Sequence, residues 1–580
     1  MLQIIVTLAI FAALVIPVGT YMYHIATNQK TFADAVFNRV DGAIYKVFKI
    51  SRAGMDWKQY ALNLLMTNAV MIGVGYLVLR LQGILFANPN GIEGMESTLS
   101  FNTIISFMTN TNLQHYSGES GLSYFSQVFV IIFMMFTSAA SGYAACMAFC
   151  RGLAGGRKDL GNFYEDMVRI TTRILIPFAF IVGLLLVSQG VPQNFIENIT
   201  VGTIEGTKQD LAMGPVAALE SIKHIGTNGG GFFGANSATP FENPTIISNI
   251  AELISMMLLP GACVITFGRM VHDRRKEAAA EKNALLPAAK KRVIFGSQGR
   301  VIFAAMSMIF LISLTLCFTS ESAGNPALEQ AGLSQEMGSM EGKEVRFGIA
   351  QSSLFTTVTT SFTTGTVNNM HDTLTPMGGF VPLLNMMLNC VFGGKGVGLM
   401  NMLMYVILTV FICGLMIGRT PEYLGKKIEG KEMKLVAIVL IVHPLLILGF
   451  SALAVASSAG LEGITNPGFH GLTQGLYEYA SSAANNGSGF EGLADNSYFW
   501  NITAGLAMFF GRYIAIAAQL AIAGSLLAKR KMNETVGTLR TDNVIFTLVL
   551  VFIVYIFAAL TFLPALALGP IAEHLTLWMP

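Results

Sequence analysis

The chain has 580 residues, of which 53% are hydrophobic and only 12% are charged, whereas soluble globular proteins carry roughly 25% charged residues. The 36 basic and 34 acidic residues nearly cancel, so no strongly basic surface is available to bind nucleic acid. The six cysteines lie in apolar runs without paired ligand spacing, which argues against a disulfide framework or a zinc site. The composition predicts an all-α integral membrane protein.

Ten segments are long and apolar enough to cross a hydrocarbon core about 30 Å thick, which needs roughly 20 residues of helix. In chain order they are approximately 3–23, 60–83, 121–150, 166–189, 245–268, 301–320, 380–417, 435–457, 498–528 and 543–565. The first has no Lys or Arg before Lys30, so we expect an uncleaved span rather than a signal peptide. The segment 380–417 contains Phe392-Gly393-Gly394-Lys395-Gly396-Val397-Gly398 and is predicted to be a broken helix.

The orientation follows from the Lys and Arg residues between the spans. One alternate set of loops holds 27 of the 36 basic residues and the opposite set holds four. Loops rich in Lys and Arg remain in the cytoplasm. We therefore expect both termini on the extracytoplasmic side.

The four long loops of the outer side follow one plan. Each contains a moderately apolar stretch of about 10–13 residues, too short to span a membrane, and then a cluster of Thr, Asn and Gly. The clusters are Thr109-Asn110-Thr111-Asn112, Thr227-Asn228-Gly229-Gly230, Thr363-Thr364-Gly365-Thr366 and Asn485-Asn486-Gly487-Ser488. This regularity predicts four helix–pore loop–helix repeats around a central pore.

The expected organisation places one helix before the repeats and one after them. The ranges are 1–59 for the N-terminal transmembrane helix and cytoplasmic loop, 60–165, 166–300, 301–434 and 435–542 for repeats 1 to 4, and 543–580 for the C-terminal helix and tail.

The composition of the clusters indicates cation coordination. Irregular backbone is tolerated at membrane depth where it lines a cavity or is buried in protein, and rings of carbonyl oxygens can replace the hydration shell of a monovalent cation. The half-helices would direct their partially negative C-terminal ends at the same site. The clusters contain no carboxylate, which a divalent-ion site would usually need, so the sequence favours K⁺.

Several segments resemble the potassium-binding A subunit of the bacterial Kdp-type potassium-transporting ATPase. The most distinctive are Gly226-Thr227-Asn228-Gly229-Gly230-Gly231-Phe232-Phe233, Gly418-Arg419-Thr420-Pro421-Glu422-Tyr423-Leu424-Gly425-Lys426-Lys427 and Ser481-Ser482-Ala483-Ala484-Asn485-Asn486-Gly487-Ser488. The resemblance implies a fold of the potassium-channel-like transporter superfamily in the bacterial inner membrane. The implied filter residues are Asn110, Thr111, Asn112, Thr227, Asn228, Gly229, Thr363, Thr364, Gly365, Asn485, Asn486 and Gly487.

The resemblance also implies partners. These are a P-type ATPase catalytic subunit, a single-span C subunit and a small F subunit, besides membrane lipid and the K⁺ ion, which is transported and is not a cofactor. The chain has neither a Walker loop nor an Asp-Lys-Thr-Gly phosphorylation motif. We therefore expect a non-catalytic subunit that uses ATP hydrolysis on another polypeptide; the alternative is a stand-alone potassium channel or a gradient-driven uptake subunit.

Three basic residues are candidate gate or vestibule groups. Lys395, in a position that is often apolar in the relatives, is either a plug below the filter or a side chain that extends to the inner interface. Arg512 faces the same vestibule, extends to the interface or forms a structural pair. Arg419 either helps to close the inner mouth or contacts the ATPase partner; the alternative is that it anchors its loop in the cytoplasm. Asn389 stands where the relatives often carry a carboxylate.

Overall fold

The computed structural model describes residues 2–282, 294–532 and 539–579. Among these residues, ten helical segments are long and apolar enough to cross a membrane. They are Leu2–Ala26, Trp57–Ile84, Tyr124–Ala154, Phe163–Ser188, Ile246–Arg274, Gly296–Gln330, Gly394–Ile417, Gly430–Ala456, Tyr498–Ala528 and Val544–Trp578. The ten predicted spans and the all-α fold class are confirmed.

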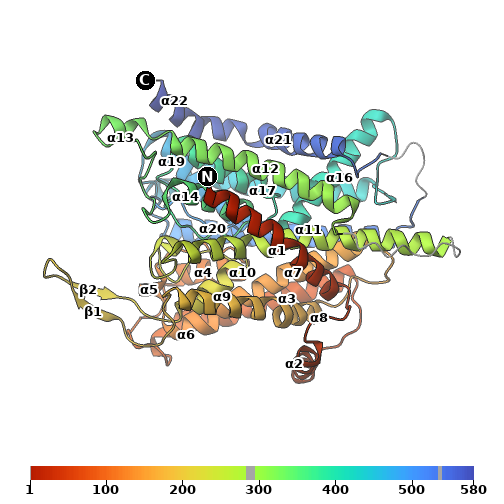
Figure 1. Cartoon of the computed structure of the whole chain (residues 1–580), viewed down its shortest axis with the longest axis horizontal. Helices are drawn as coiled ribbons and strands as arrows, with labels where there is room; N and C mark the ends of the chain where they lie inside the picture. The colour runs from red at the N-terminus through yellow and green to blue at the C-terminus, as the bar shows by residue number, and fades with distance from the viewer. Residues whose placement is uncertain (1, 283–293, 533–538, 580) are drawn as a thin grey trace.

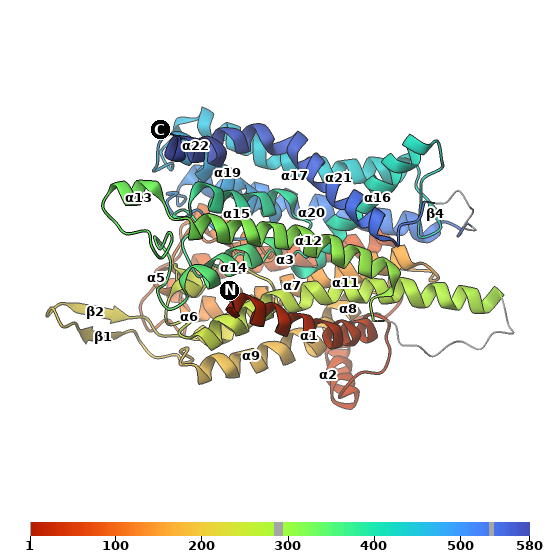
Figure 2. The ribbon, with the colours of Figure 1, turned by 45° about the horizontal axis from the view of Figure 1, so that its top comes forward.

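Most of the spans run side by side along the long axis of the molecule (Figures 1 and 2). The main helices of the spans are α1 (Leu2–Ala26), α3 (Trp57–Leu81), α7 (Phe133–Ala154), α9 (Ile176–Ser188), α11 (Ile246–Lys282), α12 (Gly296–Ser322), α16 (Val397–Ile417), α17 (Gly430–Ala456), α20 (Tyr498–Ala528) and α21 (Val544–Leu566). Short π-helical turns join α6 (Tyr124–Ser126) to α7, α8 (Phe163–Ile170) to α9, and α21 to α22 (Ala572–Trp578).

Polar caps fix where several of these helices begin. Asp56 accepts from the Gln59 backbone N–H at the start of α3, and the Gln59 side chain accepts from the Asp56 N–H, which completes a capping box. Ser497 and Asn543 cap α20 and α21 in the same way, each accepting a backbone N–H three residues later. At these three helices, a polar side chain in the preceding loop therefore satisfies a backbone N–H at the helix start.

Four shorter helices lie between the spans. They are α4 (Ser97–Met108), α10 (Val216–Ile225), α14 (Gly348–Ser361) and α19 (Gly468–Ala484), with 12, 10, 14 and 17 residues. Almost all their side chains are buried, and each helix ends where one of the Thr/Asn/Gly clusters begins. They are the expected half-helices, although α19 is longer than the predicted 10–13 residues.

The two ends of the molecule carry different small elements. The hairpin of β1 (Ile199–Gly202) and β2 (Lys208–Leu211), the helices α5 (Gly118–Gly121) and α13 (Pro326–Gln330), and α22 gather at the end where the half-helices enter (Figure 1). The opposite end carries α2 (Asp34–Val47) and the short pair β3 (Glu422–Tyr423) and β4 (Lys426–Lys427) (Figures 1 and 2). A further single turn, α18 (Ser458–Leu461), follows α17.

The predicted broken helix is confirmed. Helix α15 (Pro376–Leu388) ends at Asn389 and α16 begins at Val397. The connecting loop holds residues with positive φ at Asn389, Phe392 and Lys395 as well as at two glycines. The Phe392 ring stacks on Phe362, with centroids 4.8 Å apart and planes 3° apart. This stacking holds the loop against the end of the half-helix α14.

The elements repeat in the expected order of long helix, half-helix and long helix. The four sets are α3–α4–α7, α9–α10–α11, α12–α14–α16 and α17–α19–α20, with α1 and α21 outside them. The exact domain ranges stay predictions, and residues 283–293 of the range 166–300 and 533–538 of the range 435–542 lie outside the described residues.

Candidate ion-selectivity filter

The four clusters meet at one place, and Gly229 marks it. A Cβ atom added to Gly229 would lie 2.5 Å from the carbonyl oxygen of Thr111, 2.8 Å from that of Thr364 and 3.1 Å from that of Asn486. These three oxygens come from the three other repeats. The structure therefore brings the predicted filter positions together, with carbonyl groups that converge on a common axis and a glycine where no side chain fits.

The backbone conformation repeats among the clusters. The first filter residue of each has a positive φ: 58° at Asn110, 47° at Thr227, 52° at Thr363 and 53° at Asn485. A left-handed residue is uncommon outside glycine, so four at equivalent positions indicate one shared geometry. The third filter residue is also left-handed in three repeats, at Asn112, Gly365 and Gly487. Alternate left-handed residues turn successive carbonyls to the same side.

Side-chain hydrogen bonds hold neighbouring clusters in register. The Asn110 amide donates to the Thr227 carbonyl at 2.8 Å, and the Asn228 amide donates to the Asn110 side-chain oxygen at 2.8 Å. The Asn485 amide donates to the Thr111 hydroxyl at 3.0 Å. Because these bonds join repeats, they fix the spacing of the carbonyl oxygens without contributing a charged ligand.

Lys395 lies directly below this ring, fully buried. Its Nζ donates to the carbonyl oxygens of Asn110 and Asn485 at 2.7 Å each and to that of Thr363 at 3.4 Å. Its backbone N–H donates to the Thr227 hydroxyl at 2.8 Å. The side chain therefore contacts the filter and does not extend to the inner interface, which decides between the two geometries expected for it.

Arg512 flanks Lys395 at the inner side of the filter. A Cβ atom on Gly142 would lie 2.6 Å from an Arg512 guanidinium nitrogen and 2.7 Å from the Lys395 Cβ. Arg512 also lines a small cavity of about 40 Å³ with Asn389 and Asn485. Arg419 is not part of this group, since it is exposed beyond the end of α16, about 30 Å of helix away from Lys395.

Comparisons with known proteins identify the family of the chain. The family model of the potassium-transporting ATPase A subunit matches residues 5–575. The chain belongs to this family. It is 57% identical over 577 residues to the potassium-transporting ATPase potassium-binding subunit of Clostridium acetobutylicum, covering 99% of this chain and 100% of the relative. An A subunit of this kind is non-catalytic, and the ATPase activity lies with another subunit.

Among solved structures, the A subunit is similar to the potassium transporter TrkH from Vibrio parahaemolyticus. The TM-score is 0.48 and the sequence identity 13%, over 78% of this chain and 83% of that chain.

The mouth of the candidate filter, on the side where the half-helices enter, is a cavity of about 300 Å³ lined by Gln114, Glu491 and Asp495 among others. Burial raises the pKa of Glu491 to about 8 and that of Asp495 to about 6. Although burial lowers the pKa of His115, the carboxylates of Asp495 and Glu478 raise it to about 9. The mouth therefore carries one imidazolium and carboxyl groups that titrate near neutral pH.

Other titratable residues near the clusters form hydrogen bonds that stabilise the loops. Glu119 accepts from the Gly234 backbone N–H at 3.0 Å, and Glu242 accepts from the Phe233 N–H at 2.7 Å while fully buried. His371 is buried, with its Nδ1 2.6 Å from the Tyr477 hydroxyl oxygen, and burial lowers its pKa to about 3. These contacts hold together the loops that follow the clusters.

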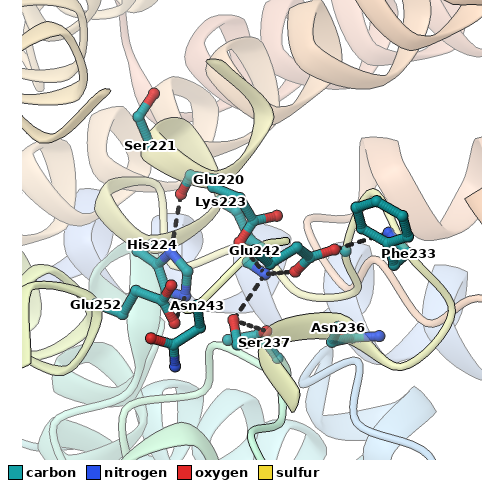
Figure 3. Close-up of polar contacts among 12 residues, drawn as sticks. Glu220, Ser221, Lys223, His224, Phe233, Asn236, Ser237, Glu242, Asn243 and Glu252 are labelled. Carbon is teal, nitrogen blue, oxygen red and sulfur yellow. Dashed lines mark hydrogen bonds and ion pairs between the residues drawn. The ribbon is translucent and has the colours of Figure 1, made fainter. Parts of the chain in front are cut away.

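A group of buried charged residues beside the filter was not anticipated as a unit. This group, called here the α10–α11 charge cluster, contains the residues Glu220, Lys223, His224, Glu242 and Glu252 (Figure 3). Its signal in the sequence is local. Glu220, Lys223 and His224 occur at positions i, i+3 and i+4 of a half-helix that is otherwise mostly apolar, so they share one helix face.

Proposed function

We propose that this A subunit selects extracytoplasmic K⁺ in a filter built from four repeats and passes it to a partner P-type ATPase subunit. The filter residues are Asn110, Thr111, Asn112, Thr227, Asn228, Gly229, Thr363, Thr364, Gly365, Asn485, Asn486 and Gly487. The observation that carries the proposal is the convergence of carbonyl oxygens from Thr111, Thr364 and Asn486 on Gly229. Such a ring can replace the hydration shell of K⁺ without a formal negative charge.

In this mechanism Lys395 blocks a straight path to the cytoplasm. Its ammonium group has three N–H donors, and three filter carbonyls accept them. A K⁺ ion arriving from outside would have to compete for the same oxygens and would meet a second positive charge at Arg512. The ion therefore leaves the axis sideways, through the cavity beside Asn389, instead of leaking inward. Arg419 belongs to the proposed contact with the ATPase subunit.

The proposed assembly includes the ATPase subunit, a single-span C subunit and a small F subunit in the bacterial inner membrane. Both termini are extracytoplasmic, the lipid-facing surfaces of the outer helices contact membrane lipid, and the chain itself has no cofactor for this function. The placement of 27 of the 36 basic residues in one alternate set of loops supports this orientation.

Substitution Gly229→Asp tests the filter. The new side chain would displace three carbonyl oxygens and add a carboxylate, so we expect the KM for K⁺ to rise at least about tenfold, equal to about 1.4 kcal/mol of binding free energy. Discrimination against Na⁺ and NH₄⁺ should weaken as well. Both are measured as ion uptake by the complete complex in vesicles.

Gly489→Asp is the matched control. A Cβ atom at Gly489 meets nothing within 4 Å, so the same carboxylate two residues beyond the filter should leave selectivity unchanged. Wild-type selectivity in Gly229→Asp, or an equal loss in both variants, would refute the filter assignment.

A further inference from the structure

The α10–α11 charge cluster lies behind the filter and takes no part in the mechanism above. Three of its members, Glu220, Glu242 and Glu252, are carboxylates with no solvent exposure. The fourth, Lys223, donates to Glu242 at 2.8 Å and forms an ion pair with Glu220. With a neutral His224, this buried group would carry two more negative than positive charges. Charges are rarely buried without a balancing partner, because each ion loses its hydration when it leaves water.

The protonation of His224 follows from its contacts. Its Nδ1 lies 2.8 Å from the backbone carbonyl oxygen of Glu220. A carbonyl can only accept, so Nδ1 carries the proton, and the neutral ring then presents a lone pair at Nε2. A histidine held through one nitrogen by a carbonyl and open at the other is typical of a metal ligand.

The open nitrogen faces carboxylate oxygens that lack partners. Among the described residues, His224 Nε2 and both carboxylate oxygens of Glu252 have no hydrogen bond, although Nε2 and one Glu252 oxygen are 3.3 Å apart. Two ligand atoms bound about 2.0–2.1 Å from a tetrahedral metal are separated by about 3.3 Å. Glu220 supplies the third atom, and one ligand atom from each of the three residues lies within 4.8 Å of the others.

We propose that Glu220, His224 and Glu252 form a buried binding site for a divalent transition-metal ion such as Zn²⁺ or Mn²⁺. One imidazole nitrogen and two carboxylates suit such ions, whereas K⁺, Mg²⁺ and Ca²⁺ prefer oxygen ligands alone. A charge of +2 balances the two excess negative charges of the cluster. Glu242 is excluded from the ligand set because Lys223 and the Phe233 N–H already occupy it (Figure 3).

The metal would join the half-helix α10 to the spanning helix α11, which supply two ligands and one ligand respectively. His224 precedes the filter residue Thr227 by three positions. The site would therefore fix the inner end of one half-helix from behind. This role is structural, and the inference does not depend on the transport mechanism.

A second cluster offers a contrast. His115 also lies among acids, Glu478 and Asp495. Both of its ring nitrogens have partners, however: Nδ1 lies 2.7 Å from the Asn501 side-chain oxygen and Nε2 3.1 Å from Glu478. Both can therefore carry protons, and the raised pKa of about 9 agrees with an imidazolium ion pair. His115 is the matched control for His224.

The test is the metal content of the purified complex. The complex is incubated with Zn²⁺ or Mn²⁺, desalted and analysed by elemental mass spectrometry. We expect about one metal ion per A subunit in the wild type and in His115→Gln. Glu252→Gln and His224→Gln, with folding checked by size-exclusion chromatography, should lose at least nine-tenths of it.

A Co²⁺-loaded wild-type sample provides a readout that needs no variant, because its visible absorption reports nitrogen and oxygen coordination. Absence of metal from the loaded wild type would overturn the proposal and favour a protonated His224 paired with Glu252. Equal loss of metal in His115→Gln would also overturn it, since the ion would then bind elsewhere.

Discussion

At the scale of single residues, Lys395 defines the inner boundary of the filter. A buried ammonium group is costly unless each N–H finds an acceptor, and here three main-chain carbonyls accept them. These carbonyls belong to the residues that end three half-helices or follow them, where the helix dipoles concentrate negative potential. In the proposed mechanism, the potential that attracts K⁺ also holds this lysine in place.

Replacement of Lys395 by methionine keeps most of the length of the side chain and removes its charge and donors. We expect the passive Rb⁺ leak through the A subunit in vesicles to rise at least about tenfold, the effect of lowering a barrier by about 1.4 kcal/mol. Lys431→Met, which removes an exposed charge, should leave the leak unchanged. A leak in Lys395→Met no larger than in the wild type would contradict a plugging role.

At the scale of elements, the loop between α15 and α16 depends on a close approach of two glycines. A Cβ atom on Gly398 would lie 2.8 Å from the Phe392 carbonyl carbon and closer still to the backbone of Gly393. The neighbouring atoms are main chain and cannot rotate away. The loop can therefore place Lys395 below the filter only because Gly398 has no side chain.

Gly398→Ala should therefore displace the loop and destabilise the A subunit by about 1–3 kcal/mol, the usual cost of overpacking. The expected readouts are a lower melting temperature and an increased Rb⁺ leak. Gly449→Ala, in α17 with nothing within 4 Å of the new Cβ, should be neutral or slightly stabilising, since Ala favours helices over Gly by about 1 kcal/mol. Equal behaviour of the two variants would argue against the close approach.

The positions of the structural elements were partly predictable from the sequence. The spans, the half-helices, the broken helix and the filter clusters each leave a local pattern in apolar length or in Thr, Asn and Gly. The direction of the Lys395 side chain leaves no such pattern in the sequence, because it depends on carbonyl groups up to 285 residues away along the chain. Glu252 was missed for the same reason. It lies within an apolar span, and only the packing of α11 against α10 brings it to His224.

At the scale of the whole molecule, the sequence has neither a Walker loop nor an Asp-Lys-Thr-Gly motif, and in this family the ATPase activity lies with another subunit. The function of the A subunit then requires another polypeptide. We expect a P-type ATPase subunit to co-purify with the tagged A subunit from its native membrane and to hydrolyse ATP faster when K⁺ is added. In Gly229→Asp the two subunits should still co-purify while the K⁺ stimulation falls. Sustained K⁺-selective flux through the A subunit reconstituted alone would instead favour a stand-alone channel.

The contacts of Lys395 also bear on the symmetry of the chain. Its side chain reaches repeats 1, 3 and 4, and its backbone N–H reaches repeat 2. A point on a fourfold axis has room for one ammonium group, so a lysine at the equivalent place in a second repeat would collide with the first and repel it. Four identical repeats could therefore never each place a lysine at this point. Divergence between the repeats is a geometric requirement of a single lysine on the axis, and a chain that fuses four unequal copies can meet it where a symmetric tetramer cannot.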